Sequence, residues 1–108
     1  MTIYDFGTIV LVNFPQTDLK KGPKRPALVI YDEGDEDVIL ARITSQPHTG
    51  KNDYEISNWQ QAGLLVPSWI RVGKLATIKK AFIQRVFGKL AQNECTPIKD
   101  ILKDMFKP

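Results

Sequence analysis

The residue with the clearest potential for chemistry is Arg25, which stands where a basic segment meets an apolar run. The sequence around it is Lys24-Arg25-Pro26-Ala27-Leu28-Val29-Ile30. A guanidinium at the start of a buried strand is a cation in a fixed position, and it can bind two oxygens of a phosphate group at once. The residues alone leave a second interpretation open, in which Arg25 is a surface side chain paired with Asp18 or with the acidic segment 32–37.

A threonine lies at the end of another apolar run, 38–44. If this run is a regular strand, Arg42 and Thr44 share one face while Ile39, Ala41 and Ile43 share the other. A threonine hydroxyl beside a cation can donate a hydrogen bond to a phosphate oxygen, but it has no neighbouring base that would make it a nucleophile. Thr44 could equally be an ordinary β-branched strand residue.

Trp69 and Arg71 share a face in the same way. An aromatic ring next to a guanidinium is suited to stack on a nucleobase while the cation holds the neighbouring phosphate. Two other interpretations remain open: a tryptophan in the core, where this residue is often largely buried, and a solvated arginine.

Three lysines precede Arg25 in the sequence, namely Lys20, Lys21 and Lys24. The net charge of +3 understates this basic character, because five of the 12 acidic residues lie in the segment 32–37. The rest of the chain carries 15 basic residues against seven acidic ones. A polyanionic partner is therefore plausible, either a nucleic acid or an acidic protein segment. We expect the acidic segment to lie away from such a site, and a solvated loop is the alternative for the lysines.

Length and composition exclude several classes of protein. The 108 residues are enough for one small domain spanning 1–108. No apolar run approaches the roughly 20 residues that span a bilayer, and the N-terminus does not resemble a signal peptide. Cys95 and His48 are the only residues of their types, so we expect no intrachain disulfide and no zinc site of the usual kind. A cytoplasmic location is expected.

Short apolar runs separated by polar turns predict a mainly β protein. The first three expected strands follow one another as an antiparallel meander. Strands are expected at 8–14, 27–31, 37–45, 54–56, 64–66 and 69–72, loops at 15–24 and 46–53, a helical turn at 57–62 and a bend at 74–80. The apolar stretch 82–90 could be a helix or a strand, and Gly88 and its β-branched residues favour a strand.

The C-terminus is the one segment with a clear helical pattern. Thr96 suits the N-cap, and Pro97 suits the first helical position. An apolar stripe follows at positions i, i+3, i+4, i+7 and i+8, formed by Ile98, Ile101, Leu102, Met105 and Phe106. We expect this stripe to pack against the strands.

Several segments taken together form a wider pattern, which covers nearly the whole chain. They are Gly7-Thr8-Ile9-Val10-Leu11-Val12-Asn13-Phe14-Pro15, Thr17-Asp18, Arg25-Pro26-Ala27-Leu28-Val29-Ile30, Ala41-Arg42-Ile43-Thr44-Ser45-Gln46, Ser68-Trp69-Ile70-Arg71-Val72-Gly73-Lys74-Leu75 and Phe87-Gly88-Lys89-Leu90. In this order and at this spacing they resemble the PemK/MazF-like toxins of type II toxin–antitoxin systems.

The resemblance implies an SH3-like β-barrel with a few helices, usually a homodimer. It further implies an endoribonuclease that cuts single-stranded RNA without metal or cofactor, and a cognate antitoxin that blocks the RNA site with an acidic segment. The catalytic pair that it implies is Arg25 and Thr44. The other residues that we predict to bind RNA are Lys20, Lys21, Lys24, Arg42, Ser45, Gln46, Trp69 and Arg71.

The general base is not identified by the resemblance. Some family members carry a glutamate shortly before the arginine, whereas this chain has Lys20-Lys21-Gly22-Pro23 there. Asp18 is the nearest carboxylate. His48 follows Thr44 by four residues, and an imidazole is suited to proton transfer near neutral pH. Both remain candidates for the general base.

Functions without catalysis form the alternative. The chain could be a gyrase inhibitor like the CcdB-like toxins, which share the barrel, or an RNA-binding domain that does not cut. It could also be a degenerate homologue that retains only antitoxin binding. The C-terminal Met105-Phe106-Lys107-Pro108 gives little support to the gyrase alternative, because CcdB-like toxins end in an aromatic and acidic tail.

Overall fold

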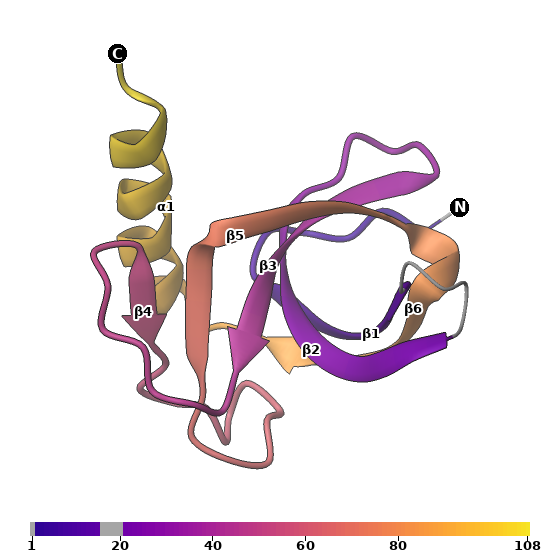
Figure 1. Cartoon of the computed structure of the whole chain (residues 1–108), viewed down its shortest axis with the longest axis horizontal. Helices are drawn as coiled ribbons and strands as arrows, with labels where there is room; N and C mark the ends of the chain where they lie inside the picture. The colour runs from indigo at the N-terminus through magenta and orange to yellow at the C-terminus, as the bar shows by residue number, and fades with distance from the viewer. Residues whose placement is uncertain (1, 16–20) are drawn as a thin grey trace.

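The strands of this protein form one strongly curved antiparallel sheet. The computed structural model describes residues 2–15 and 21–108. Within these residues the elements are β1 (Thr8–Pro15), β2 (Lys21–Tyr31), β3 (Asp37–Thr44), β4 (Asp53–Glu55), β5 (Trp69–Lys79), the 3-10 turn η1 (Lys80–Phe82), β6 (Ile83–Lys89) and α1 (Gln92–Phe106). The strand order is β4-β5-β3-β2-β1-β6. The strands curl into a barrel-like ring with α1 beside it (Figure 1), which confirms the predicted fold class and the meander.

Two hydrophobic clusters hold the sheet, one on each of its faces. The first includes Ile9, Leu28 and Ile43 and is completed by Ile98 of α1. The second comes from strands alone and includes Val10, Ala27, Val29, Val38 and Leu40. Because alternate residues of β1, β2 and β3 enter different clusters, these strands are apolar on both faces. Burial of each such side chain contributes about 1.5–3 kcal/mol, which makes these three strands a rigid support.

Strand β2 begins earlier than the sequence predicts. The segment 21–24 was expected in a loop, but its backbone pairs with β1, with Val12 opposite Arg25 and Asn13 opposite Lys24. The reason is that β1 continues to Pro15 and offers backbone partners for this extension. Arg25 therefore lies within a paired strand and not at the end of a loop.

Strand β5 also differs from the prediction. The sequence predicts that the strand ends before a bend at 74–80, but the strand continues to Lys79 and the 3-10 turn η1 follows it. Ala41 pairs with Leu75, whereas the next residue, Arg42, pairs with Arg71. The residues between Arg71 and Leu75 thus form a bulge that turns the strand without ending it, and Figure 1 shows β5 sharply bent. The strand expected at 64–66 is also wrong. Residues 64–66 form part of a loop, and they are apolar in part because Leu64 packs in the first cluster.

Helix α1 begins at Gln92 and not at the predicted N-cap Thr96. Its first turn is fixed by a tertiary contact: the buried carboxylate of Glu94 accepts hydrogen bonds from the Tyr54 hydroxyl at 2.9 Å and from the Ser57 amide at 2.6 Å. Pro97 consequently lies inside the helix. The expected packing is confirmed for most of the stripe, although Phe106 is exposed. Among the described residues, no helix is long and apolar enough to cross a membrane.

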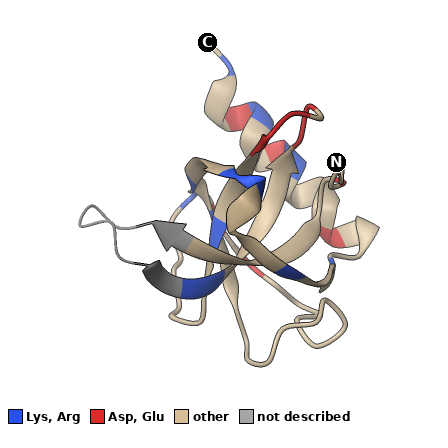
Figure 2. Cartoon of the chain, turned by 90° about the vertical axis from the view of Figure 1, so that its right-hand side faces the viewer, with Lys and Arg blue, Asp and Glu red and all other residues tan. Residues whose placement is uncertain are grey.

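The acidic segment lies away from Arg25, as expected. Figure 2 shows the acidic turn between β2 and β3 far from the basic part of β2. Asp32 is tied down by the Lys80 ammonium at 2.8 Å and by the Tyr4 amide at 2.7 Å. Burial alone would raise the pKa of Asp32, but the hydrogen bonds from Lys80, Tyr4 and Gly34 outweigh it and lower that pKa below its usual value. Asp32 therefore fixes the N-terminal segment to the barrel.

Candidate functional site

The pairing of the strands brings the predicted site residues together. Ala27 pairs with Arg42, which pairs with Arg71, which in turn pairs with Asp53. Continued by two residues, the register of β2 and β3 places Arg25 level with Thr44. Residues two apart on a strand share a face, so all these residues continue the face that carries Val29 and Leu40 in the second cluster. These polar site residues thus lie where the apolar part of this face ends.

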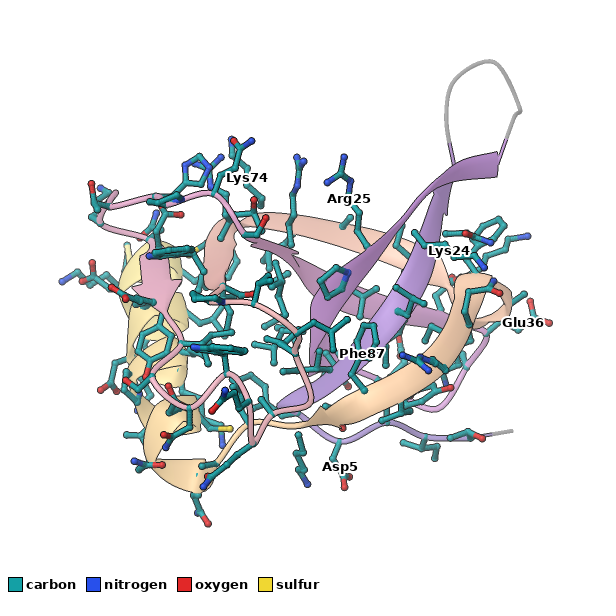
Figure 3. All side chains as sticks on the ribbon, turned by 90° about the horizontal axis from the view of Figure 1, so that it is seen from below. Asp5, Lys24, Arg25, Glu36, Lys74 and Phe87 are labelled. Carbon is teal, nitrogen blue, oxygen red and sulfur yellow. The ribbon has the colours of Figure 1, made fainter. Side chains whose placement is uncertain are left out.

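A cavity of about 440 Å³ opens at this place. It is lined by eight of the residues predicted from the sequence, namely Lys24, Arg25, Arg42, Thr44, Ser45, Gln46, His48 and Arg71. Figure 3 shows the Arg25 side chain projecting outward from this edge of the molecule. The volume of the cavity is within the range of ordinary small-molecule sites, and it can hold part of a polymer.

Positive charge dominates this cavity. The described residues that line it include four cations, Lys24, Arg25, Arg42 and Arg71, and no Asp or Glu. Like charges that line one cavity repel one another, and a bound polyanion would relieve that repulsion. The arrangement is therefore suited to a phosphodiester backbone.

The Thr44 hydroxyl is held by its own turn. It accepts a hydrogen bond from the Gln46 amide at 3.2 Å, the pattern in which a threonine side chain closes a short turn. Since this bond uses only a lone pair of the oxygen, the hydroxyl proton is available for a ligand acceptor. Thr44 is thereby oriented as a hydrogen-bond donor.

Arg71 is positioned by an acidic partner that no local sequence pattern predicts. Its Nε donates to Asp53 Oδ1 at 3.2 Å. The other oxygen of Asp53 accepts the Gly50 amide at 2.9 Å. Asp53 thus fixes the guanidinium and the turn at Gly50 together, and it leaves the terminal nitrogens of Arg71 for a ligand.

One wall of the cavity comes from the loop between β4 and β5. Gly63, with φ of 92°, lies against the backbone of β6 so closely that a Cβ there would overlap the Phe87 carbonyl. Gly88 meets the Ala62 carbonyl in the same way. These two glycines permit a close contact that places Leu65 and Val66, both exposed, on the cavity rim.

One predicted site residue, Trp69, lies outside this group, and for three others the structure describes no side chain. Trp69 is paired with Thr44 and Glu55, but it lines neither the cavity nor either hydrophobic cluster. Lys20 and Asp18 fall outside the described residues, as does the side chain of Lys21. The roles predicted for these four residues remain predictions.

Two cavity features were not foreseen from the sequence. Asp53 meets Arg71 only through the pairing of β4 with β5, a contact that no local pattern signals. Phe87 also lines the cavity, and the Arg85 guanidinium lies 4.8 Å from its ring centre. The sequence predicts Phe87 only as part of the last strand and of the family pattern, since nothing in its neighbours indicates which face of the strand it occupies.

Comparison with known families agrees with the fold. Residues 5–106 match the model of the PemK-like, MazF-like toxins of type II toxin–antitoxin systems. Because this match extends over almost the entire chain, the protein belongs to that family. A search of curated protein sequences finds no match.

Several solved structures share the fold. MazF from Deinococcus radiodurans has a TM-score of 0.75 at 17% identity, covering 97% of both chains. The Mycobacterium tuberculosis toxin MazF-mt6 has a TM-score of 0.74 at 20% identity, covering 92% of this chain and 95% of its own. An endoribonuclease from a Mycobacterial species, in complex with its cognate antitoxin, has a TM-score of 0.76 at 14% identity, covering 92% and 90%. At these identities the likeness establishes the fold.

Proposed function

We propose that this chain, as a single domain of residues 1–108, is an endoribonuclease toxin that cuts single-stranded RNA without a metal ion. The observation that carries the proposal is the meeting of Arg25 and Thr44 in one cavity with three further cations. Membership of the MazF-like toxin family supports it, as does the endoribonuclease activity named for the Mycobacterial neighbour.

The proposed reaction is an intramolecular transesterification of the RNA backbone. The 2′-oxygen forms a bond to phosphorus, the bond to the 5′-oxygen breaks, and the products are a 2′,3′-cyclic phosphate and a 5′-hydroxyl. One proton leaves the 2′-hydroxyl and one reaches the 5′-oxygen. Arg25 binds the non-bridging oxygens and stabilises the charge of the phosphorane, while the Thr44 hydroxyl donates to one of the same oxygens. Arginine holds its proton too tightly to serve as an ordinary acid.

His48 is the group that we propose for proton transfer. It lines the same cavity as Arg25 and Thr44, and an imidazole can accept the proton of the 2′-hydroxyl near neutral pH. Asp18, the other candidate, lies outside the described residues. Lys24, Arg42 and Arg71 would hold the phosphates on either side of the reacting one, since a cation binds any phosphate of the backbone. Ser45 and Gln46 would offer hydrogen bonds to the bases.

The cationic cavity also suggests how the toxin is restrained. We propose that an acidic segment of a cognate antitoxin occupies it and competes with RNA, because both ligands would neutralise the same arginines. The Mycobacterial endoribonuclease forms a complex with its antitoxin, which supports this partner. A homodimer acting in the cytoplasm, where its RNA substrates are, completes the proposal.

Product analysis tests the proposed activity. The purified chain is incubated with a mixed-sequence single-stranded RNA in excess EDTA, and the 5′-hydroxyl ends are mapped by sequencing. We expect discrete cleavage that is lost in Arg25→Ala and retained in Lys103→Ala, which removes an exposed cation of α1 that does not line the cavity. Intact RNA, or cleavage that persists in Arg25→Ala, would overturn the proposal. Intact RNA together with a trapped gyrase–DNA complex would favour the CcdB-like alternative.

A further inference from the structure

Glu94 of α1 is a buried carboxylate that takes no part in the proposed reaction. It is only 2% exposed, and burying a carboxylate is costly unless hydrogen bonds compensate it. An acid in the first turn of a helix can stabilise the amides of that turn from the solvent side. Glu94 instead accepts hydrogen bonds from three donors outside its helix, namely the Tyr54 hydroxyl at 2.9 Å, the Ser57 amide at 2.6 Å and the Asn58 amide at 3.2 Å. The buried charge therefore holds one segment, which consists of β4 and the turn that follows it.

Tyr54, the first of these donors, lies in a strand with little support of its own. Strand β4 is three residues long and lies at the edge of the sheet, so its only neighbouring strand is β5. A short edge strand opens easily, because few backbone hydrogen bonds hold it. Figure 1 shows β4 beside α1, and the hydrogen bond between Tyr54 and Glu94 joins the two elements. This bond adds a fixed point that pairing with β5 alone does not give.

Asp53, the residue before Tyr54, connects this fixed point to the cavity. Successive residues of a strand point to opposite faces, so Tyr54 packs against the first cluster while Asp53 faces Arg71. The Arg71 Nε donates to Asp53 Oδ1 at 3.2 Å, and Arg71 lines the cavity. Every step between α1 and the Arg71 guanidinium is therefore a hydrogen bond or a covalent bond.

We propose that Glu94 is a positioning residue for the RNA site, which acts through β4 on Arg71. This inference rests on the proposed function, because it takes Arg71 as a cation that binds RNA. Glu94 itself touches no ligand. Without its bond to Tyr54, the guanidinium stays in the cavity but is held less precisely, so RNA binds less tightly while Arg25 still holds the reacting phosphate.

Binding measurements in two backgrounds test this coupling. Fluorescence anisotropy follows a short random-sequence RNA with 2′-methoxy groups, which has no free 2′-hydroxyl for cleavage. Tyr54→Phe removes the hydrogen bond to Glu94, and Glu94→Gln keeps the size of the side chain but turns an amino group towards one of the donors. Ile98→Val, a small change at a buried position of the same helix, is the control for lost stability. Each change is made in the wild type and in Arg71→Met, and circular dichroism checks that every variant is folded.

The two changes should weaken RNA binding only where Arg71 is present. In the wild-type background we expect Tyr54→Phe and Glu94→Gln to raise the dissociation constant about three- to fivefold. In Arg71→Met the same changes should have an effect of less than about twofold, because no guanidinium is left to position. Ile98→Val should bind RNA like its parent in both backgrounds. Equal losses of affinity in the two backgrounds would show that the contact is only structural and would overturn the inference.

Steady-state kinetics on cleavable RNA give a second measurement. Tyr54→Phe and Glu94→Gln should raise KM by a factor similar to the change in the dissociation constant and leave kcat nearly unchanged, because the interaction concerns binding and not the reacting phosphate. A fall in kcat at constant KM is the result that contradicts a role through Arg71.

The inference and the proposed function can fail separately. If the wild type cleaves RNA and both changes bind it like Ile98→Val, Glu94 does not position the site and the activity stands. If both changes weaken binding only in the presence of Arg71 but cleavable RNA stays intact, the positioning role stands and the catalytic proposal fails. If the wild type binds no RNA, both fail.

Discussion

Arg25 and Thr44 come from different strands, and their meeting depends on the register between β2 and β3. The apolar residues that follow Arg25 on its strand are buried on both faces. A slip by one residue would move Val29 out of the second cluster and turn the Arg25 side chain to the opposite face of the sheet, which makes the register strongly specified. The same packing that stabilises the barrel fixes the distance between the two side chains.

Thr44 should contribute through its hydroxyl proton. Thr44→Val keeps the shape of the side chain and removes the hydrogen bond to the phosphate, so we expect the cleavage rate constant to fall about 100-fold. Thr44→Ser should retain most of the activity, because it keeps the hydroxyl and the turn with Gln46. Single-turnover kinetics on one RNA would measure both, and equal rates for Thr44→Val and wild type would contradict the role of Thr44 as a donor.

Asp53 should act only by positioning Arg71. In Asp53→Asn the amide oxygen can still accept the Gly50 amide, but the charged partner of the Arg71 guanidinium is lost. We expect KM to rise about three- to tenfold with kcat little changed, because the interaction concerns binding and not the reacting phosphate. Asp53→Glu should recover part of the loss, and Asp100→Asn on the exposed face of α1 is the matched control. A fall in kcat at constant KM would contradict this assignment.

At the scale of secondary-structure elements, local sequence patterns predict which helices and strands form, but not how these elements pack against one another. Short apolar runs anticipate β1 and β3, and period-two alternation anticipates the shared face of Arg42 and Thr44. The start of α1 at Gln92 could not be predicted, because it depends on the contact of Glu94 with Tyr54 and Ser57, some 40 residues away. The helix signals at Thr96 and Pro97 are genuine preferences that this tertiary contact overrides.

The same limit applies to the site. The sequence identifies the residue types that suit phosphate, but the contact of Asp53 with Arg71 and the bulge of β5 follow from the pairing of β4 and β3 with β5. Both depend on contacts between distant residues, which a single sequence does not encode in any local pattern.

The contact of α1 with β4 should control local stability. Tyr54→Phe removes the hydroxyl that donates to Glu94 and should lower the free energy of unfolding by about 1 kcal/mol. Glu94→Ala leaves the Ser57 and Asn58 amides without their acceptor and should cost about 2–4 kcal/mol. Urea unfolding at neutral pH measures both, and equal stability of the Glu94→Ala variant and wild type would contradict the contact.

This contact also has a signature at high pH. Burial, together with the hydrogen bond to Glu94, raises the pKa of Tyr54 from 10.0 to about 12. A raised pKa favours the neutral phenol in the folded state, so its contribution is present below about pH 10 and is lost as the pH rises towards 12. We expect a spectrophotometric titration at 295 nm to show a tyrosine with a pKa near 12 that is absent from Tyr54→Phe. Identical titration curves for the two proteins would contradict this.

For the whole molecule, the separation of charge is the feature that suits a polyanionic ligand. The acidic turn lies far from the basic part of β2 (Figure 2), and none of the residues 32–37 lines the cavity. Charges of opposite sign on separate parts of the surface orient an approaching polyanion towards the cations. The fold thus supports the site by where it places its acids as well as its bases.

Asp32 should link global stability to acid pH. Its pKa is lowered in the folded state, so it stabilises the fold above its usual value of 3.8, and this contribution is lost as the pH falls below that value. Asp32→Asn should therefore be less stable than wild type at pH 6, by about 1–3 kcal/mol, and the difference should shrink at pH 3. Thermal unfolding at the two pH values measures this, with Asp104→Asn as the exposed control. A constant difference would contradict the role of the charged Asp32.

The most direct test of the central claim is the rate at which Arg25 variants cleave RNA. Single-turnover rate constants would be measured in EDTA for wild type, Arg25→Ala, Arg25→Lys and Lys103→Ala on one mapped cleavage site. If Arg25 stabilises the phosphorane through its two-pronged guanidinium, Arg25→Ala should be slower by about 100- to 1,000-fold. Arg25→Lys should recover little of this loss, and Lys103→Ala, at an exposed position of α1, should stay within a few-fold of wild type. Cleavage by Arg25→Ala at close to the wild-type rate would contradict the account.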